Sequence, residues 1–205
     1  MPSQKLKKGA RYRYREQWLT EAAKALEKHA TKEGYDVKHW RVTVSWPSQR
    51  AGRGTRRVIG QCFYGSASGD GTHEILVSPK LEKGLDVLEV IAHEMAHIIA
   101  GPDCGHKGMY PEVGRMFMLN PPWTSTTPSF DFKRWAKPVL AKLGTYPHTE
   151  LDFTNTKKQK TRMMKFECSG CGWIGRASSA RLEQAMPLCG DEECSAFGQA
   201  MDVSS

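Results

Sequence analysis

Residues 91–106 have the sequence "IAHEMAHIIAGPDCGH", and this stretch decides how the first part of the chain is interpreted. His93 and His97 stand four residues apart, and Glu94 directly follows the first of them. Together with the residues before it, the stretch becomes "LDVLEVIAHEMAHIIA", residues 85–100, which predicts a helix that a Gly-Pro pair terminates. The two histidines should therefore lie one turn apart on the same side of a helix.

The expected helix is amphipathic. At about 100° per residue, its apolar side chains form one stripe: Leu88, Ile91, Ala92, Met95, Ile98 and Ile99. The opposite side, expected to face away from the core, carries Asp86, Glu89, His93, Glu94 and His97. Histidines at i and i+4 have Cβ atoms about 5–6 Å apart, so their nitrogens can bind one zinc ion at about 2.0–2.1 Å. Two solvated histidines are the alternative, but the helix and the turn that follows favour a metal site.

A third protein ligand is needed for a catalytic zinc ion. One known subclass has glycine three and histidine six residues after the second histidine, but this chain has Ala100 and Asp103 there, which excludes that subclass. His106 is the favoured third ligand because it completes a neutral three-imidazole set just past the tight turn. Other residues are chemically capable of the same role: Asp103, Cys104, Glu112 and His148.

Three protein ligands leave a fourth zinc position for water, whose pKa the metal lowers from 15.7 to about 7. Glu94 is then placed to accept a proton from that water during attack on an amide carbonyl, and to pass it to the leaving amine. The predicted reaction is peptide hydrolysis. Three residues are unranked candidates for stabilising the oxyanion: Tyr110, Arg115 and His148.

A second metal site is predicted near the end of the chain, where "CSGCGWIG" and "CGDEEC" supply two pairs of cysteines. Its ligands are Cys168, Cys171, Cys189 and Cys194. Four thiolates fill a tetrahedral zinc site and leave no position for water, so this zinc ion should be structural. It would also stabilise a lobe of about forty residues, which is too small for a self-sufficient core. Four unrelated thiols are the alternative, and Cys62 is expected in the core.

The remaining pattern predicts an α+β fold in a chain of 205 residues. Short strands are expected at "VTVSW", "GQCFYG" and "EILVS", and helices at "QWLTEAAKALEKHA", "PEVGRMFML" and "DFKRWAKPVLAKL". The expected organisation is a main domain at residues 1–154, a basic linker at 155–165 and a four-cysteine zinc ribbon at 166–205. No apolar run approaches the roughly 18 residues that span a bilayer, so a cytoplasmic protein without a membrane partner is expected.

Charge is unevenly distributed along the chain. The net charge is +8, yet residues 166–205 carry −4, which leaves +12 on residues 1–165. Basic clusters occur in "LKKGARYRYR", "SQRAGRGTRR" and "KKQKTRMMK", and the first interleaves tyrosine with arginine. DNA is the expected partner, although charge runs are also typical of solvated faces. The predicted phosphate contacts are Arg56, Arg57, Lys157, Lys158 and Lys160.

Taken together, "EILVSPKL", "VIAHEMAHIIAGPDCGH", the basic linker and the four-cysteine ribbon resemble the SprT-like zinc metallopeptidases, the family that includes Spartan. The resemblance covers most of the chain, at about residues 18–201, and is to a compact bacterial or phage version. It implies a zincin-like domain, zinc ligands at His93, His97 and His106, and a catalytic Glu94. It also implies proteolysis of proteins bound or crosslinked to DNA. The histidine-to-histidine interval is shorter than in Spartan-type members, and "GHKGMYPEV" lacks their usual Gly and Phe spacing.

Two other classes of function remain open on the sequence. One is a zinc peptidase that has no connection with DNA and cleaves unstructured protein equally well in its absence. The other is a zinc-stabilised DNA-binding or regulatory protein without peptidase activity.

Overall fold

The computed structural model describes residues 7–47, 58–151 and 163–204. The chain divides into two compact units, Met1–Asp152 and Phe153–Ser205. Most of the expected linker lies outside the described residues, but strand β6 (Met163–Glu167) begins within it. Met163, Met164 and Lys165 pair with the next strand, so the last three residues of the expected linker belong to a strand of the second unit.

The first unit contains a three-stranded sheet with the order β1-β3-β2. Its strands are β1 (Trp40–Val44), β2 (Gly60–Phe63) and β3 (His73–Val77), each within two residues of the expected position. Strand β1 runs parallel to β3, whereas β2 runs antiparallel to it. With the helices described below, this mixed sheet confirms the α+β class.

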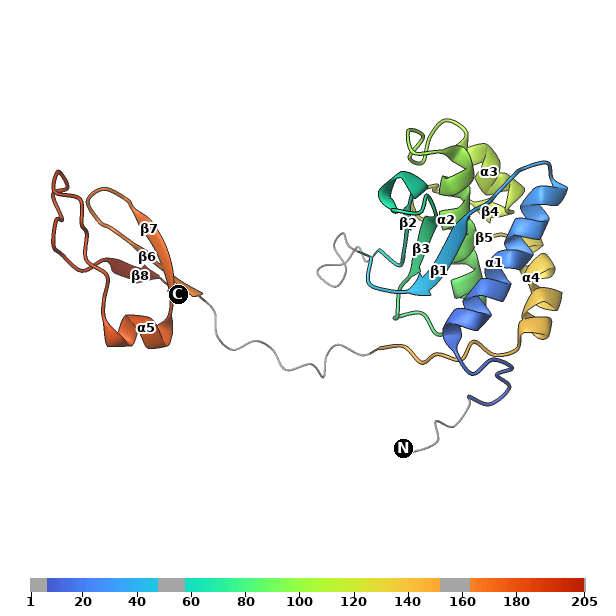
Figure 1. The fold of residues 1–205 in the computed structure, drawn as a ribbon, viewed down its shortest axis with the longest axis horizontal. Helices are drawn as coiled ribbons and strands as arrows, with labels where there is room; N and C mark the ends of the chain where they lie inside the picture. The colour runs from blue at the N-terminus through green and yellow to red at the C-terminus, as the bar shows by residue number, and fades with distance from the viewer. Residues whose placement is uncertain (1–6, 48–57, 152–162, 205) are drawn as a thin grey trace. The chain divides into compact units, whose positions relative to one another are not determined.

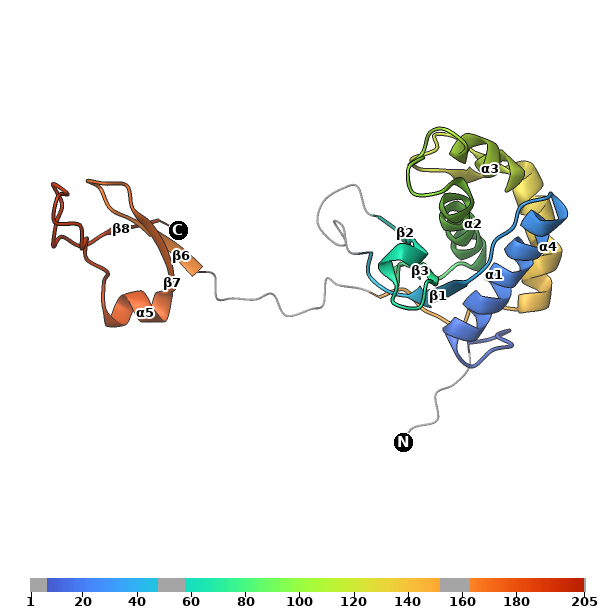
Figure 2. The ribbon, with the colours of Figure 1, turned by 45° about the horizontal axis from the view of Figure 1, so that its top comes forward.

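Two long helices pack against the sheet, and a third packs against both of them. Helix α1 (Arg15–Lys32) contacts β1, and helix α2 (Gly84–Ala100) contacts β2 and β3. Helix α4 (Phe130–Leu143) contacts α1 and α2, and Figures 1 and 2 show it running beside α1. Pro138 lies inside α4 without ending it. Helix α2 is therefore enclosed by the sheet and by other helices along much of its length.

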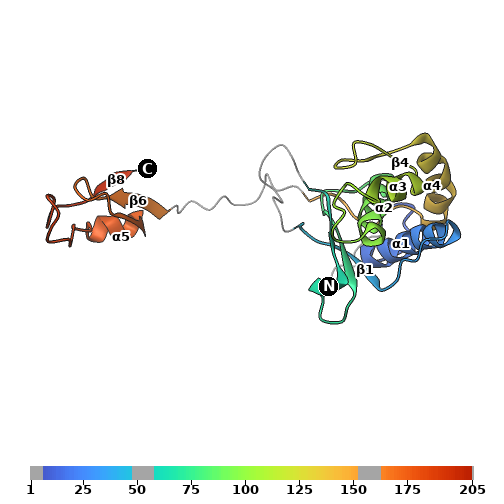
Figure 3. The same cartoon turned by 90° about the horizontal axis from the view of Figure 1, so that it is seen from above.

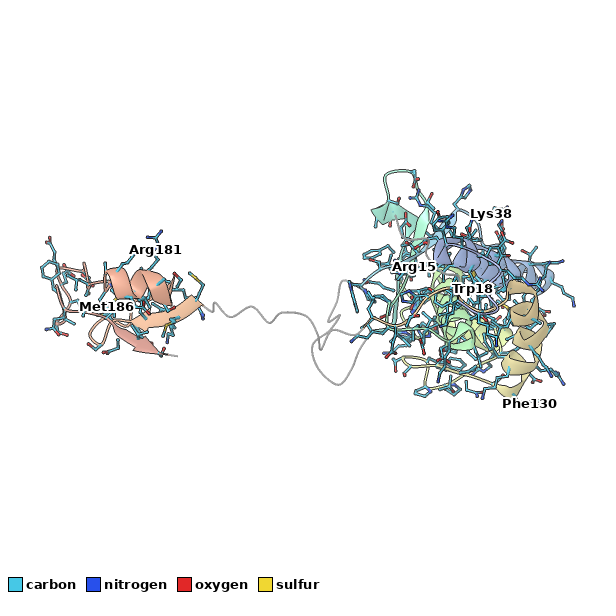
Figure 4. The ribbon with its side chains drawn as sticks, turned by 90° about the horizontal axis from the view of Figure 1, so that it is seen from below. Arg15, Trp18, Lys38, Phe130, Arg181 and Met186 are labelled. Atoms are coloured by element: carbon cyan, nitrogen blue, oxygen red, sulfur yellow. The ribbon has the colours of Figure 1, made fainter. Side chains whose placement is uncertain are left out.

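The core of the first unit is centred on α1 and α2. Trp18 is fully buried, and its indole N–H donates a hydrogen bond of 3.0 Å to the backbone oxygen of Gly144, just past α4. The Trp18 ring also packs on Tyr146, with ring centroids 4.8 Å apart. Figure 4 labels Trp18 on α1, and also Phe130, which lies at the start of α4 and is 78% exposed. These contacts hold the first turn of α1 against the segment that follows α4. Gly84, the first residue of α2, lies close to the Trp18 ring.

A short helix and a small hairpin complete the first unit. Helix α3 (Tyr110–Met116) follows the expected pattern but ends three residues before its predicted limit. The reason is that Leu119–Asn120, strand β4, pairs instead with Thr127–Pro128, strand β5. Helix α3 contacts α2, and Figure 3 shows the two helices together from above. The hairpin brings residues 119–129 toward the polar side of α2.

The second unit is a small three-stranded sheet with the order β7-β6-β8 and one short helix. Strand β6 pairs with β7 (Ile174–Ser178) and with β8 (Asp202–Ser204), and helix α5 (Ser179–Gln184) follows β7. Its buried apolar cluster is small: Phe166, Cys168, Leu182, Cys189, Ala196 and Met201. Two of these six residues are cysteines, so the unit depends on its sulfur atoms for much of its interior. In the part of the chain that the structure describes, no helix has the length and apolar character needed to cross a membrane.

Candidate metal centres

The three histidines of the opening motif converge at the C-terminal half of α2. The Nε2 atom of His106 lies 3.2 Å from Nε2 of His97 and 3.3 Å from Nε2 of His93. Three nitrogens bound to one zinc ion at about 2.0–2.1 Å in a tetrahedral arrangement would lie about 3.3–3.4 Å apart. The observed spacing therefore fits a shared metal ion, and these three residues could hold one.

The three imidazoles are in the neutral form that binds a metal ion, because the pKa of each is lowered. Burial, followed by the neighbouring imidazoles, lowers the pKa of His93 to about 3. The same causes lower the pKa of His97 to about 4, and burial lowers the pKa of His106. A neutral imidazole keeps a lone pair on one nitrogen, and that lone pair is what a metal ion binds.

A tight turn brings His106 back to the helix. Helix α2 ends at Gly101, whose φ of +88° is unfavourable for residues with a side chain and whose N–H donates to the His97 carbonyl at 2.9 Å. The ring of Tyr110, from α3, then packs against all three imidazoles at centroid distances of 4.5–5.4 Å. Its hydroxyl donates to the backbone oxygen of His93 at 3.3 Å. The cluster is thus supported from α2, from the turn and from α3.

Glu94 lies in a buried position beside strand β2. Glu94 is only 6% exposed. If Gly60 carried a Cβ atom, that atom would lie 2.5 Å from Oε1 of Glu94. Only glycine allows β2 to approach the carboxyl group this closely. Burial, with a smaller effect from Glu89, raises the pKa of Glu94 to about 8.

A chain of hydrogen bonds connects His93 with a second buried carboxyl group. The Nδ1 atom of His93 lies 2.9 Å from Oγ1 of Thr126, and the Thr126 hydroxyl donates to Oε1 of Glu89 at 2.6 Å. Glu89 is 8% exposed, and its burial raises the pKa of its carboxyl group.

The expected polarity of α2 was wrong in one respect. The sequence pattern placed Glu89 and Glu94 on a side facing away from the core, but both are buried, whereas Ile98 and Ile99 are only half-buried. The cause is tertiary: β2 covers the side chain of Glu94, and Thr126 from the segment before β5 reaches that of Glu89. Two carboxyl groups on the polar side of the helix are therefore buried, on the same side as the half-buried His93 and His97.

The other residues considered as ligands or oxyanion stabilisers lie in different surroundings. His148 contacts Nη1 of Arg15 at 3.1 Å through Nδ1 and the backbone oxygen of Pro79 at 2.9 Å through Nε2. Glu112 accepts a hydrogen bond from Tyr35, and Arg115 lies over the Trp123 ring. Asp103 is exposed and Cys104 is half-buried. Among the described residues, neither belongs to a group of side chains that could hold a metal ion. Of the three oxyanion candidates, Tyr110 is the one that contacts the imidazoles.

The four cysteines of the second unit also converge. Sγ of Cys168 lies 3.7 Å from Sγ of Cys194, and Sγ of Cys171 lies 3.9 Å from Sγ of Cys189. These distances are far longer than a disulfide bond of about 2.05 Å, and they match the edge of about 3.8 Å expected for four sulfurs at 2.3 Å from zinc. The four residues could hold a metal ion.

Backbone N–H groups stabilise the thiolate form of one member of this cluster, Cys168, whereas neighbouring thiols and burial raise the pKa of Cys171 and Cys189. The Gly170 N–H donates to Sγ of Cys168 at 3.4 Å, and the Ala196 N–H donates to Sγ of Cys194 at 3.3 Å. The N–H groups of Cys171 and Gly170 lower the pKa of Cys168 to about 6. A thiolate is the form that binds a metal ion, so the loop geometry suits metal ligation. Cys62, in contrast, is half-buried on β2, where burial raises its pKa to about 12.

The predicted phosphate contacts lie outside the described residues: Arg56, Arg57, Lys157, Lys158 and Lys160. Three further residues shape the imidazole site, and the sequence assigned none of them a role there. Glu89 stands four residues before His93, a spacing that signals contact on a helix, and Gly60 is the first residue of an apolar strand. Thr126 is 33 residues from His93 and carries no local signal.

Comparison of the chain with protein-family models, with characterised proteins and with solved structures finds no match. The two ligand clusters and the residues around them are therefore the features from which a function can be inferred.

The two clusters predict a stoichiometry of two zinc ions per chain. His93→Ala should remove one ion because it leaves two imidazoles, and Cys168→Ser should remove the other because it breaks the four-sulfur set. Elemental analysis of the purified variants measures both losses, and circular dichroism checks that the first unit stays folded. A single zinc ion in the wild-type chain, or the loss of both ions from a folded His93→Ala variant, contradicts two independent sites.

Proposed function

We propose that the first unit is a zinc-dependent endopeptidase with a zincin-like fold of the SprT-like type. The observation that carries this proposal is a three-imidazole cluster in which one ligand, His93, is directly followed in the chain by a buried glutamate, Glu94. Three imidazoles leave one position of a tetrahedral zinc ion open, which is the arrangement of catalytic rather than structural zinc sites. When bound, the zinc ion would polarise a carbonyl group and make water more acidic.

The proposed roles of the chain's own residues follow from their positions. Glu94 would accept a proton from the attacking water through its carboxylate and later donate it to the leaving amine. Gly60 would keep the carboxyl group in place because β2 lies against it. Tyr110 would fix the imidazoles by packing on their rings. Burial of Glu94 would exclude bulk water from the carboxyl group and so keep its pKa suited to proton transfer near neutral pH.

We assign the four-cysteine cluster a structural zinc ion. Four thiolates complete the tetrahedral coordination, so this ion would have no open position for a substrate. It would stabilise a unit whose apolar interior is small.

The test of the peptidase proposal is cleavage of an unfolded protein by the zinc-loaded chain, in parallel with the Glu94→Gln variant. Zinc-dependent cleavage that requires Glu94 supports the proposal. A folded chain with two zinc ions that cleaves no protein, with or without DNA, contradicts it and favours the zinc-stabilised binding protein.

We further propose that the peptidase acts on DNA-bound or DNA-crosslinked proteins. Among the described residues, the N-terminal segment, residues 7–15, favours DNA binding. It contains five cations and no acidic residue. Lys8, Arg11 and Arg13 are exposed there, and the Arg13 guanidinium lies 5.6 Å from the centroid of the Tyr14 ring, which is 54% exposed. Phosphate binding uses such cations, and an exposed aromatic ring can stack on a base.

The segment is held against the body of the first unit rather than extending from it. Ala10 forms a bridge with Gly144, and the Thr145 N–H donates to the Gly9 carbonyl at 3.0 Å. Its cations are therefore held together on one side of the unit, which lowers the entropic cost of binding a polyanion.

Neutralising this segment is expected to weaken DNA binding. Changing Lys8, Arg11 and Arg13 to glutamine should lower affinity and reduce the slope of log K against log salt by up to about 0.9 per lost duplex contact, or about 0.7 on single strands. Fluorescence anisotropy at several salt concentrations measures both quantities. A separate variant neutralises the contacts predicted from the sequence: Arg56, Arg57, Lys157, Lys158 and Lys160.

The matched control removes the same number of exposed cations where each is already paired with a carboxylate: Lys24 with Glu21, Lys38 with Asp36 and Arg134 with Asp131. This variant should bind DNA more tightly than the segment variant. If all the variants bind with the wild-type affinity and salt slope, the DNA proposal is wrong. Cleavage of a DNA-binding protein at equal rates with and without single-stranded DNA would leave a peptidase unrelated to DNA.

A further inference from the structure

Three side chains form a continuous hydrogen-bonded series behind one ligand of the imidazole cluster. Because the Thr126 hydroxyl hydrogen is directed to Glu89, its oxygen is left to accept the N–H of His93 Nδ1. That assignment places the hydrogen of neutral His93 on Nδ1 and the lone pair on Nε2. Nε2 is the atom that lies 3.3 Å from Nε2 of His106, inside the cluster.

We propose that Thr126, held by Glu89, is a positioning residue that fixes the tautomer and ring orientation of His93 for metal binding. The inference rests on the proposed zinc ion at the imidazole cluster, and it adds a residue and a role to that site. It does not require that the bound metal be used for peptide hydrolysis.

The fold supplies this contact from two distant parts of the chain. Glu89 stands one turn before His93 on α2. Because Glu89 is buried, water cannot readily replace Thr126 as its hydrogen-bond partner. Thr126 directly precedes β5, whose pairing with β4 fixes the end of the hairpin. The hairpin therefore does more than connect α3 with α4, since it carries the hydroxyl group that bridges a buried carboxyl group and a ligand.

The other α2 ligand has a different support. The backbone of Gly105 forms a hydrogen bond with His97, so the turn that carries His106 also orients His97. A side-chain substitution cannot delete that backbone contact, whereas it can delete the bridge to His93. Thr126 is consequently the position at which ligand orientation can be tested without altering a ligand.

Thr126→Val is expected to weaken zinc binding at the imidazole cluster by about 10–100-fold, the usual cost of removing a partner behind a metal-bound histidine. Valine keeps the branched shape and removes the hydroxyl group. Thr126→Ser keeps the hydroxyl group and should restore affinity close to the wild-type value. Thr127→Val is the matched control, because Thr127 is the exposed next residue of the same hairpin.

Zinc affinity is measured by competition with a chromophoric chelator in the full chain, with the four-cysteine site loaded first. A second readout is the tautomer of His93 in the metal-free protein, obtained from ¹⁵N chemical shifts of the ring. The wild type, Thr126→Ser and Thr127→Val should show the Nδ1–H form, and Thr126→Val should show a larger share of Nε2–H. A role confined to packing would not change the tautomer in this pattern.

The outcomes separate this inference from the proposed function. Two zinc ions in the wild type, with equal zinc affinity and an unchanged tautomer in Thr126→Val, overturn the positioning role and leave the peptidase proposal standing. A wild-type chain that binds zinc only at the cysteines overturns the proposed function. In that case the tautomer comparison alone decides whether Thr126 orients His93.

Discussion

Glu94→Gln is expected to lower the rate of peptide hydrolysis by about 10²–10⁴-fold while both zinc ions stay bound. Glutamine has nearly the same shape as glutamate, so it fits the space between α2 and Gly60. It has no carboxylate to accept a proton from water, and the three imidazoles that form the ligand set are unchanged. The comparison of kcat with zinc content at a fixed pH measures the effect on proton transfer alone.

The control for this variant is a glutamate that lies away from the imidazole cluster. Glu33, at the end of α1, is exposed, and Glu33→Gln makes the same chemical change there. It should leave hydrolysis unchanged. Near wild-type activity in Glu94→Gln would mean that another group accepts the proton, and the proposed mechanism would have to be abandoned.

The parts of the fold that the sequence predicted are those governed by local patterns. The alternation of apolar and polar residues, with a glycine to end the helix, located α2 to within one residue of its start. The three strands were located because short segments rich in β-branched, aromatic or other apolar residues are separated by connections rich in glycine, serine and arginine. The spacing of the cysteines and histidines likewise picked out the residues that the structure brings together.

The parts that the sequence could not predict depend on which distant segments cover which surface. The helical periodicity of α2 divides polar from apolar residues, but it does not say whether the polar side meets water. Here β2 and the β4–β5 hairpin cover that side, so Glu89 and Glu94 are buried and their pKa values rise. A buried polar helix face is costly unless each group is paired or functional.

Helix α3 illustrates a competition that local propensity cannot resolve. Residues 117–119 continue an apolar helical pattern, yet Met118 has a φ of +55° and Leu119 pairs with Pro128. The tertiary pairing outweighs helix propensity, which is a small effect for each residue. As a result, the chain turns back toward α2, and Thr126 reaches Glu89 and His93.

The second large effect is expected on the stability of the metal-free protein. Burial, with a contribution from Glu89, raises the pKa of Glu94 from its ordinary value of 4.5 to about 8. Because the folded state binds this proton more tightly than the unfolded state, the contribution of Glu94 is fully favourable below about pH 4.5. It is lost as the pH rises toward 8. Glu94→Gln should therefore unfold with a free energy larger than that of the wild type by about 4 kcal/mol near pH 7.5.

Urea unfolding at several pH values tests this expectation in a Trp173→Phe background, where the remaining tryptophans all belong to the first unit. The difference between variant and wild type at each pH removes the opposing contributions of His93 and His97, whose lowered pKa values weaken the fold in acid. Bound zinc should shrink the difference, since a nearby cation favours the carboxylate. Glu33→Gln, which makes the same chemical change at an exposed position, is the control in the same background. A difference between Glu94→Gln and the wild type that stays constant from pH 4.5 to 8 would show that the Glu94 carboxyl group is not held protonated by burial. The burial of that group against Gly60 would then lose its main energetic consequence.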